Sequence, residues 1–204
     1  MAMKALTLTQ PWASLVAIGA KRIETRSWRT PYRGSLAIHA AKGFPKWAKE
    51  TCTELEFASE LGPAPLPIGM VIATCRLIAC VPTRELQQNR VIEVDYLAGC
   101  ADFLLDDRER AFGDYTPGRW AWLLADVKPC EPIAAKGALS LWDWETLTQR
   151  VEAGSHVYNP LTFEVKSCSI RYSRHKCVAM RTDSERYALS MSGSAGSNLK
   201  HSSR

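Results

Sequence analysis

The chain has 204 residues, 46% of them hydrophobic and 23% charged, and its formal net charge is +5. These values are ordinary for a soluble globular protein with one domain, or one domain and an extension, and a chain of this length can bury a core without disulfides or metal ions. No apolar run approaches the roughly 18 residues of a membrane span, so we expect no membrane insertion.

The charge is unevenly distributed along the sequence. Residues 155–204 hold 8 basic and 3 acidic residues, whereas residues 1–154 hold 18 of each. Within that neutral part, residues 1–49 carry 9 bases and a single acid, Glu24, and residues 50–114 carry 5 bases and 12 acids. A basic segment that also contains tryptophans suits a polyanion with stackable bases. The alternative is that the basic and acidic segments pair with each other in the fold.

The seven cysteines favour no disulfide framework. Their number is odd, no pair has C-x-x-C spacing, and no histidine falls at a zinc-like interval. We therefore expect reduced thiols in a cytoplasmic protein, with no metal site and no cofactor. The N-terminal run ALTLTQPWASLVAIGA is interrupted by Thr7, Thr9, Gln10 and Pro11, which argues against a secretory signal.

The hydrophobic pattern predicts short strands and helices in chain order. Residues 4–8 read as a strand, residues 9–19 as a helix that ends at Gly19, and residues 21–28 as an alternating strand. The later elements are expected as strands at 35–42, 69–81 and 118–129, an amphipathic helix at 45–61, helical pieces within 83–113, a loop passing into a strand or turn at 136–144, and a closing helical turn at 145–152.

Apolar side chains at regular spacing predict the core. Trp120 and Trp122, and likewise Trp142 and Trp144, are i, i+2 pairs that we interpret as core in preference to a platform for stacked bases. His39 lies on a strand and is expected to be structural. The helix at 45–61 is expected to bury Trp47, Cys52, Leu55, Ala58 and Leu61.

These elements predict a mixed α/β, mainly β domain over residues 1–154. Residues 155–204 lose the core-type periodicity and end in SMSGSAGSNLKHSSR, so we predict a disordered or loosely ordered basic, Ser/Gly-rich tail. The common enzyme motifs are absent from the sequence, including a glycine-rich phosphate loop, G-x-S-x-G and H-E-x-x-H.

The stretch GAKRIETRSW, residues 19–28, sets one acid among several bases. Strand alternation places Glu24, Arg26 and Trp28 on one face of the predicted strand and Thr25 on the opposite face. Lys21 lies in the turn before the strand and is expected to reach the face that carries Glu24. A carboxylate held among cations accepts from the amino group of cytosine or adenine, or acts as a general base. The lysine binds phosphate or polarises a carbonyl. The alternative is a solvated face whose ion pairs contribute about 0–1 kcal/mol each.

Three further residues follow in the turn beside this strand. Arg29, Tyr32 and Arg33 are candidate phosphate contacts. Trp28 is expected with equal weight to line a cleft or to join the core. The eight bases of the tail would add non-specific, salt-sensitive affinity for nucleic acid, or would keep a disordered segment in solution.

The same stretch carries a recognisable family motif. Gly19, Lys21, Glu24 and Arg26 fit the pattern G-x-K-x-x-E-x-R, between QPWASL and RSW-x-TP-x-RG. This region closely resembles the opening of the ASCH domain, the family named for activating signal cointegrator 1 homology, and looks like its cointegrator-type branch. The resemblance is dense over residues 5–42, weaker to about residue 145, and does not cover the tail.

The resemblance implies a fold and a set of partners. The fold would be PUA-like, a small β-barrel with flanking helices and a charged cleft beside the motif. The partners would be RNA, DNA or a modified nucleoside, with RNA expected first. The expected ligand-binding residues are Lys21, Glu24, Arg26, Trp28, Arg29, Tyr32 and Arg33.

Two other functions remain open at this stage. One branch of the family consists of small amidohydrolases that act on N4-acetylcytidine and use a lysine, a threonine and a glutamate. Lys21 matches that lysine, but Glu24 stands at the threonine position, and Thr25 is one residue further on. Lys21 and Glu24 would be catalytic only under this alternative. The third possibility is a protein-interaction adaptor with a protein partner.

Overall fold

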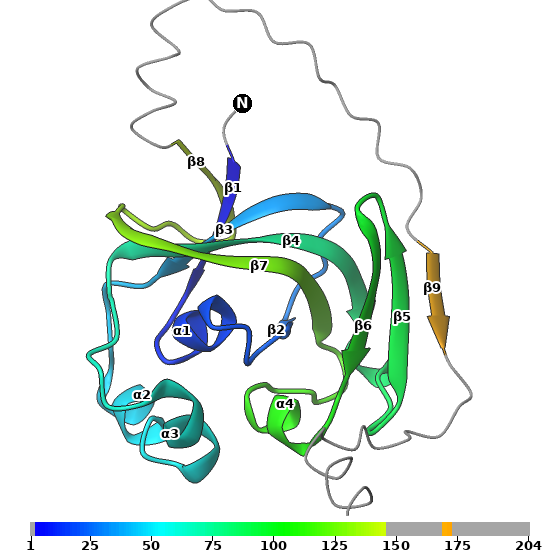
Figure 1. Cartoon of the computed structure of the whole chain (residues 1–204), viewed down its shortest axis with the longest axis horizontal. Coiled ribbons are helices and arrows are strands. Elements are labelled where there is room, and N and C mark those ends of the chain that lie inside the picture. The colour runs from blue at the N-terminus through cyan, green and yellow to red at the C-terminus, as the bar shows by residue number, and fades with distance from the viewer. Residues whose placement is uncertain (1–2, 146–168, 173–204) are drawn as a thin grey trace, which may run out of the picture. The chain divides into compact units, whose positions relative to one another are not determined.

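A computed structural model describes residues 3–145 and 169–172 of the chain (Figure 1). Strands outweigh helices among these residues, as predicted for a mixed, mainly β domain. The elements in chain order are β1 (Met3–Leu8), α1 (Trp12–Ala17), β2 (Ile23–Arg26), β3 (Gly34–Ala40), α2 (Lys46–Thr51), α3 (Leu55–Leu61), β4 (Met70–Pro82), a 3-10 turn (Thr83–Glu85), β5 (Val91–Tyr96), β6 (Gly99–Leu104), α4 (Asp107–Ala111), β7 (Trp120–Ala134), β8 (Leu141–Trp144) and β9 (Ser169–Tyr172).

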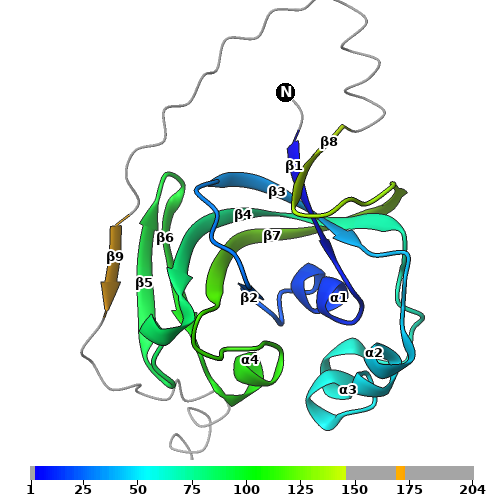
Figure 2. The same ribbon diagram turned by 180° about the vertical axis from the view of Figure 1, so that it is seen from behind.

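The main sheet is an open sheet of six strands. Its order is β2-β7-β4-β3-β1-β8, with β1 parallel to β3 and the other neighbours antiparallel. The long strands β4 and β7 pair along most of their length, and three register shifts interrupt their ladder. Such irregularities bend and twist a pair of strands. The sheet curves over α1, as both views show (Figure 2).

The predicted small β-barrel is wrong. The outer strands β2 and β8 each pair with one neighbour and not with each other, so the sheet does not close. Closure requires a continuous stagger of paired strands around a barrel, and here the run of paired strands stops at both edges. Helix α1 occupies the concave side of the sheet and contacts β1, β3, β4 and β7.

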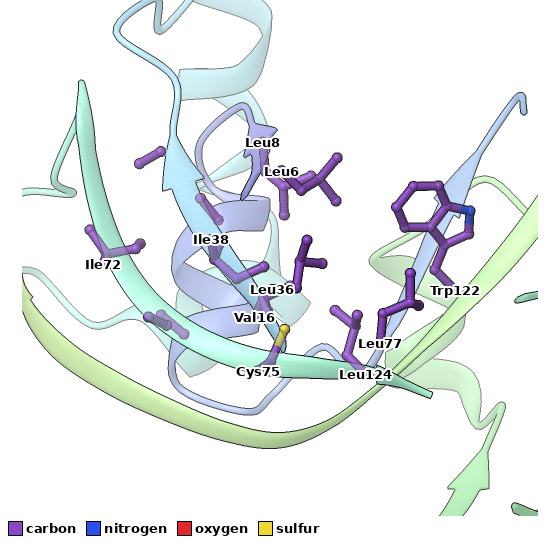
Figure 3. Close-up of a cluster of buried hydrophobic side chains, with 14 of the residues drawn as sticks. Leu6, Leu8, Val16, Leu36, Ile38, Ile72, Cys75, Leu77, Trp122 and Leu124 are labelled. Atoms are coloured by element: carbon purple, nitrogen blue, oxygen red, sulfur yellow. The ribbon is translucent and has the colours of Figure 1, made fainter. Parts of the chain in front are cut away.

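The core between α1 and the sheet consists of side chains from strands far apart in the sequence. Figure 3 shows Leu36, Leu77 and Trp122 gathered with Val16 of α1, and all four side chains are fully buried. Burying an aliphatic side chain of this size stabilises a fold by roughly 1.5–3 kcal/mol. Because a helix of six residues is not stable alone, this packing holds α1 in place.

Residues 83–113 differ from the prediction of helical pieces. Most of this region forms the antiparallel hairpin of β5 and β6, and α4 follows it. In β5 the buried Ile92 and Val94 alternate with the less buried Glu93 and Asp95, which is the strand period. The apolar run around YLAGCADFLL masked that period, because helix and strand are hard to separate in short apolar runs.

The predicted helix at 45–61 is divided into α2 and α3. Thr53 donates its hydroxyl to the Glu50 carbonyl (2.7 Å), and such side-chain bonds compete with helix continuation. The buried side chains are Ala48 and Phe57 instead of the predicted stripe. Trp47, which was predicted to be buried, is 57% exposed.

The tryptophan pairs pack in the core, as predicted. Trp122 and Trp144 are buried, and Trp120 and Trp142 pack against the same two clusters. His39 is also buried, with Nε2 3.1 Å from the Ala135 carbonyl oxygen, as expected for a structural histidine.

Part of the chain lies outside the described residues. The closing turn predicted at 145–152 falls there apart from residue 145, as does most of the tail predicted at 155–204. Within that tail the structure describes β9, which pairs antiparallel with β5, whereas the prediction placed no strand there. No helix in the described part of the chain is long and apolar enough to cross a bilayer.

Cysteine reactivity tests the burial in this fold. Burial raises the pKa of the Cys75 thiol to about 12 and also raises the pKa of Cys80. Desolvation and the neighbouring Asp95 raise the pKa of Cys100 too, but its thiol lies exposed on β6. We expect iodoacetamide at pH 8 to alkylate Cys100 at least about 100-fold faster than Cys75 or Cys80, because the buried thiols react only after opening. Peptide mapping by mass spectrometry measures the rates. Equal rates in the native protein would contradict the fold, and urea-unfolded protein provides the control.

Candidate functional site

The strand that carries Glu24 is fixed along both of its edges. One edge of β2 pairs with β7, where Glu24 lies opposite Trp122. On the other side, the amide of Ile23 in β2 and the amide of Arg22, which immediately precedes β2, donate to the carboxylate of Glu109 on α4, at 3.2 and 2.8 Å. A side chain therefore satisfies backbone donors that an edge strand would otherwise leave unpaired.

Lys21 lies behind this strand and is completely buried. Its Nζ donates to the Ile23 carbonyl oxygen at 2.6 Å. The same nitrogen is 3.8 Å from Glu24 Oε2 and 3.7 Å from Glu109 Oε1. One ammonium group, with its three donors, thus faces three oxygens. A buried cation is tolerated in a protein interior only when it is paired in this way.

Glu24 lies between two cations. Its Oε1 is 3.6 Å from Arg26 Nη1, and its other oxygen faces Lys21. The residue is only 6% exposed, whereas the Arg26 side chain is 26% exposed. The carboxylate is therefore held in one orientation, with Lys21 behind it and Arg26 towards solvent.

The second carboxylate of this network belongs to Glu109. Burial raises its pKa, and the charge of Lys21 and the two backbone donors oppose that rise. The Tyr115 hydroxyl lies 3.3 Å from Glu109 Oε1, and its pKa is raised by burial and by the neighbouring carboxylate. Tyr115 is therefore a neutral hydrogen-bond donor, so the network holds one lysine, two carboxylates and a phenol.

A pocket of about 460 Å³ opens beside Glu24. Its lining comes from the end of β1 and the turn after it, α1, β2, α2 and the segment from Ala111 to Arg119. Gly113 is part of this wall, and a Cβ there would lie 2.9 Å from Tyr115 Cε2 and 3.2 Å from Lys21 Nζ. Only glycine lets the backbone lie this close to the buried network.

Two tryptophans form an aromatic rim at this pocket. The ring centroids of Trp12 and Trp47 are 5.8 Å apart, and Trp12 also packs edge-on against Phe57. Trp12 is thereby fixed, whereas Trp47 presents more than half of its surface to solvent. An exposed indole beside a polar pocket offers a flat surface on which a heterocycle stacks.

The structure brings some of the predicted site residues together. Lys21, Glu24 and Arg26 form one network, and Glu24 and Arg26 line the pocket. Lys21 is completely buried behind Glu24 and is not among the lining residues. Thr25 does line the pocket, although we expected it to face away, and its hydroxyl accepts from the Asp114 amide at 3.2 Å.

Trp28 and Arg29 lie in the segment between β2 and β3. Neither is among the residues that line the pocket. Trp28 packs edge-on against the buried Trp122 at 4.7 Å, with Arg26 5.9 Å from its ring centroid. Arg29 lies 5.6 Å from the ring centroid of Trp120.

Tyr32 and Arg33 are also outside the pocket lining. The Tyr32 hydroxyl donates to the Ser35 carbonyl oxygen. Arg33 donates to the carbonyl oxygens of Thr30 and Tyr32. These bonds shape the turn before β3, so the structure brings neither residue to Glu24.

Several residues of the site were not found from the sequence. Glu109 fell in the region expected to hold helical pieces, Tyr115 lay between the predicted elements, and Trp47 was assigned to a buried stripe. The one usable signal was D-x-x-E at Asp106 to Glu109, a helix-start pattern in which the Asp106 side chain accepts from the Glu109 amide at 2.7 Å. That pattern locates α4 but does not reveal the contact with β2.

A comparison with protein families decides the family question. The model of the ASCH domain matches residues 6–134. The chain belongs to the ASCH domain family. The G-x-K-x-x-E-x-R motif therefore lies in this ASCH domain at β2 and the turn before it, beside the pocket.

Individual relatives cover less of the chain. A 91-residue region is 36% identical to activating signal cointegrator 1 of Mus musculus, and the match covers 41% of this chain and 15% of the cointegrator. For Homo sapiens activating signal cointegrator 1 the identity is 34% with the same coverage. Among solved structures, the ASCH protein of Zymomonas mobilis is 16% identical with a TM-score of 0.34, covering 92% of this chain and 94% of that one. A mutant of it gives a TM-score of 0.38 and covers 74% and 94%.

Removing the buried lysine tests the network. We expect Lys21→Met to lower the free energy of unfolding by about 3–5 kcal/mol, because it leaves the buried carboxylates without their shared cation. Without Lys21 the pKa of Glu109 rises further above its ordinary value of 4.5. A carboxyl whose pKa is raised on folding contributes stability below pH 4.5, and that stability is lost as the pH rises through the folded-state pKa. The difference in free energy of unfolding between wild type and Lys21→Met should therefore grow from pH 4.5 to 7.

Urea unfolding across that pH range measures the effect. The double variant Lys21→Met/Glu109→Gln should recover part of the loss and flatten its pH dependence. An unchanged free energy of unfolding in Lys21→Met would show that the lysine does not stabilise this network.

Proposed function

We propose that this ASCH domain binds single-stranded nucleic acid, or a nucleoside, by accepting one base into the pocket beside Glu24. The observation that carries the proposal is the buried Glu24 carboxylate, which is oriented by two cations at a pocket that also has a tryptophan rim. RNA is the first ligand to test, with DNA and modified nucleosides as alternatives.

Each lining residue has a distinct role in this proposal. Glu24 accepts from the exocyclic amino group of a base such as cytosine or adenine. Trp47 stacks on the ring, and Arg26 and Arg119 donate to a base carbonyl or a phosphate. Lys21 orients Glu24 and does not touch the ligand, because its side chain is fully buried behind that carboxylate.

Substitutions of Glu24 and of Trp47 separate these roles. We expect Trp47→Ala to weaken binding to a short single-stranded RNA by about 1–3 kcal/mol, or about 5- to 150-fold, because one stacked base loses its platform. Glu24→Gln should reduce the preference for bases with an amino group while retaining affinity from phosphate contacts. Fluorescence anisotropy with labelled oligonucleotides measures both effects. The exposed Leu55→Ala on α3 is the matched control.

Salt dependence tests whether phosphates contribute. Each lost phosphate contact should reduce the slope of log K against log salt by about 1, so Arg26→Ala or Arg119→Ala should show a shallower slope than wild type. Arg84→Ala, an exposed arginine in the 3-10 turn, should show no change. If no oligonucleotide or nucleoside binds at low salt, the proposal fails, and a protein-interaction adaptor becomes the better interpretation of the relation to the cointegrators.

A hydrolase acting on an acylated nucleoside is the second candidate function. The observation that favours it is Thr25, a hydroxyl residue that lines the same pocket as Glu24. Lys21 argues against it, because its ammonium group already faces three oxygens and is inaccessible to a ligand. The binding proposal therefore ranks first.

Mass spectrometry decides between the two functions. We expect no conversion of N4-acetylcytidine to cytidine after prolonged incubation with the purified protein. Conversion that disappears in Thr25→Val, with the fold retained by circular dichroism, would make this chain a hydrolase. Conversion that persists in Thr25→Val and disappears in Glu24→Gln would instead indicate a water attack assisted by Glu24.

A further inference from the structure

A second and larger cavity lies away from the Glu24 pocket. Its volume is about 950 Å³, and its lining comes from β1, from β3 and the residues just after it, from the residues just before β4, and from the end of β7 and the chain after it. No residue lines both this cavity and the Glu24 pocket. We call it the Lys42–Lys136 groove, after the two lysines among its lining residues.

The walls of the groove are largely aliphatic. Leu139 is 93% exposed and Ile68 is 41% exposed, and four alanines lie among the other lining residues. Large aliphatic side chains that gather at one exposed site mark a surface that another molecule covers. The groove therefore has the character of an interaction surface.

The charge of the groove indicates which class of molecule would bind there. Lys42 and Lys136 are both exposed, and the residues that line the groove include no aspartate or glutamate. They also include no tryptophan, tyrosine or phenylalanine, so the groove lacks the aromatic surface on which single-stranded bases stack. A cationic, aliphatic groove is complementary to an acidic segment with aliphatic side chains, and it favours such a peptide over nucleic acid.

The floor of the groove is held firmly. Among the described residues, the buried His39 bonds through Nε2 to the Ala135 carbonyl and leaves Nδ1 without a partner. Burial lowers the pKa of this histidine, so it is neutral at pH 7, and Nδ1 is an acceptor. A Cβ at Gly137 would lie 2.6 Å from Nδ1 and 2.9 Å from Thr7 Oγ1, so the backbone of the wall rests directly on β1 and β3. A preformed groove loses little ordering entropy when it is occupied.

We propose that the Lys42–Lys136 groove binds an acidic, aliphatic peptide segment of a partner protein. An aliphatic side chain of the peptide packs against Ile68 and Leu139, and its carboxylates pair with Lys42 and Lys136. The site is separate from the proposed nucleobase pocket and does not depend on it.

Selection from a randomised peptide library on phage, with the full chain as bait, tests the proposal. We expect enrichment of peptides in which aspartate or glutamate flanks leucine, isoleucine or valine. Enriched peptides, resynthesised with a fluorescent label, should bind Lys42→Glu/Lys136→Glu at least about tenfold more weakly than wild type. The control Lys46→Glu/Lys49→Glu makes the same change of charge on α2 and should bind normally.

Three results would overturn the proposal. The first is no enrichment over an unrelated bait, or enriched peptides that bind the Lys42→Glu/Lys136→Glu variant as well as wild type. In the second, the Lys42→Glu/Lys136→Glu variant binds a labelled oligouridylate more weakly than wild type but binds the peptides equally well. That result would assign the groove to nucleic acid. In the third, light scattering shows that wild type is a dimer and that the same variant is a monomer. That result would assign the groove to a second copy of this chain.

Discussion

The carboxylate of Glu109 is the contact on which the candidate site depends. It accepts from the Ile23 amide of β2 and from the Arg22 amide just before the strand, and it faces the ammonium group of Lys21, so one side chain fixes both the start of the strand and the buried cation. β2 is a four-residue edge strand, and Glu109 adds to the bonds that Lys21 and Arg119 donate to the carbonyl oxygens of Ile23 and Thr25. Because Lys21 is fixed in turn, the carboxylate of Glu24 lies between Lys21 and Arg26 at the wall of the pocket.

This arrangement explains why an acid occurs in the basic opening of the chain. Glu24 neutralises part of the charge of Lys21 and Arg26, and Glu109 supplies the second carboxylate beside the fully buried Lys21. Two carboxylates and a lysine that are buried together form a network in which each member requires the others, since an unpaired charge there costs several kcal/mol. The polarised sequence is thus partly explained by pairing within the fold, because Glu109 comes from the acidic segment and Lys21 from the basic one.

The two cavities differ in the chemistry they offer. The Glu24 pocket combines a fixed carboxylate, arginines and an exposed indole, which are groups that recognise a heterocycle with polar edges. The Lys42–Lys136 groove combines aliphatic walls with two lysines. Since no residue lines both of them, the proposed binding of a base and the proposed binding of a peptide would not compete for the same side chains.

Local pattern determined the elements whose period is regular, namely β1, α1, β2, β3, β4 and β7, and the motif at Gly19, Lys21, Glu24 and Arg26 identified the family. Tertiary structure alone decided the rest. The Glu109 carboxylate meets the Arg22 amide across 87 positions of sequence, and no local spacing encodes such a contact. The sheet stays open because pairing stops at β2 and β8, and strand period says nothing about closure. Trp47 came to the rim of the pocket because the helix expected at 45–61 divides, so a side chain assigned to the core by its spacing instead faces solvent beside Trp12.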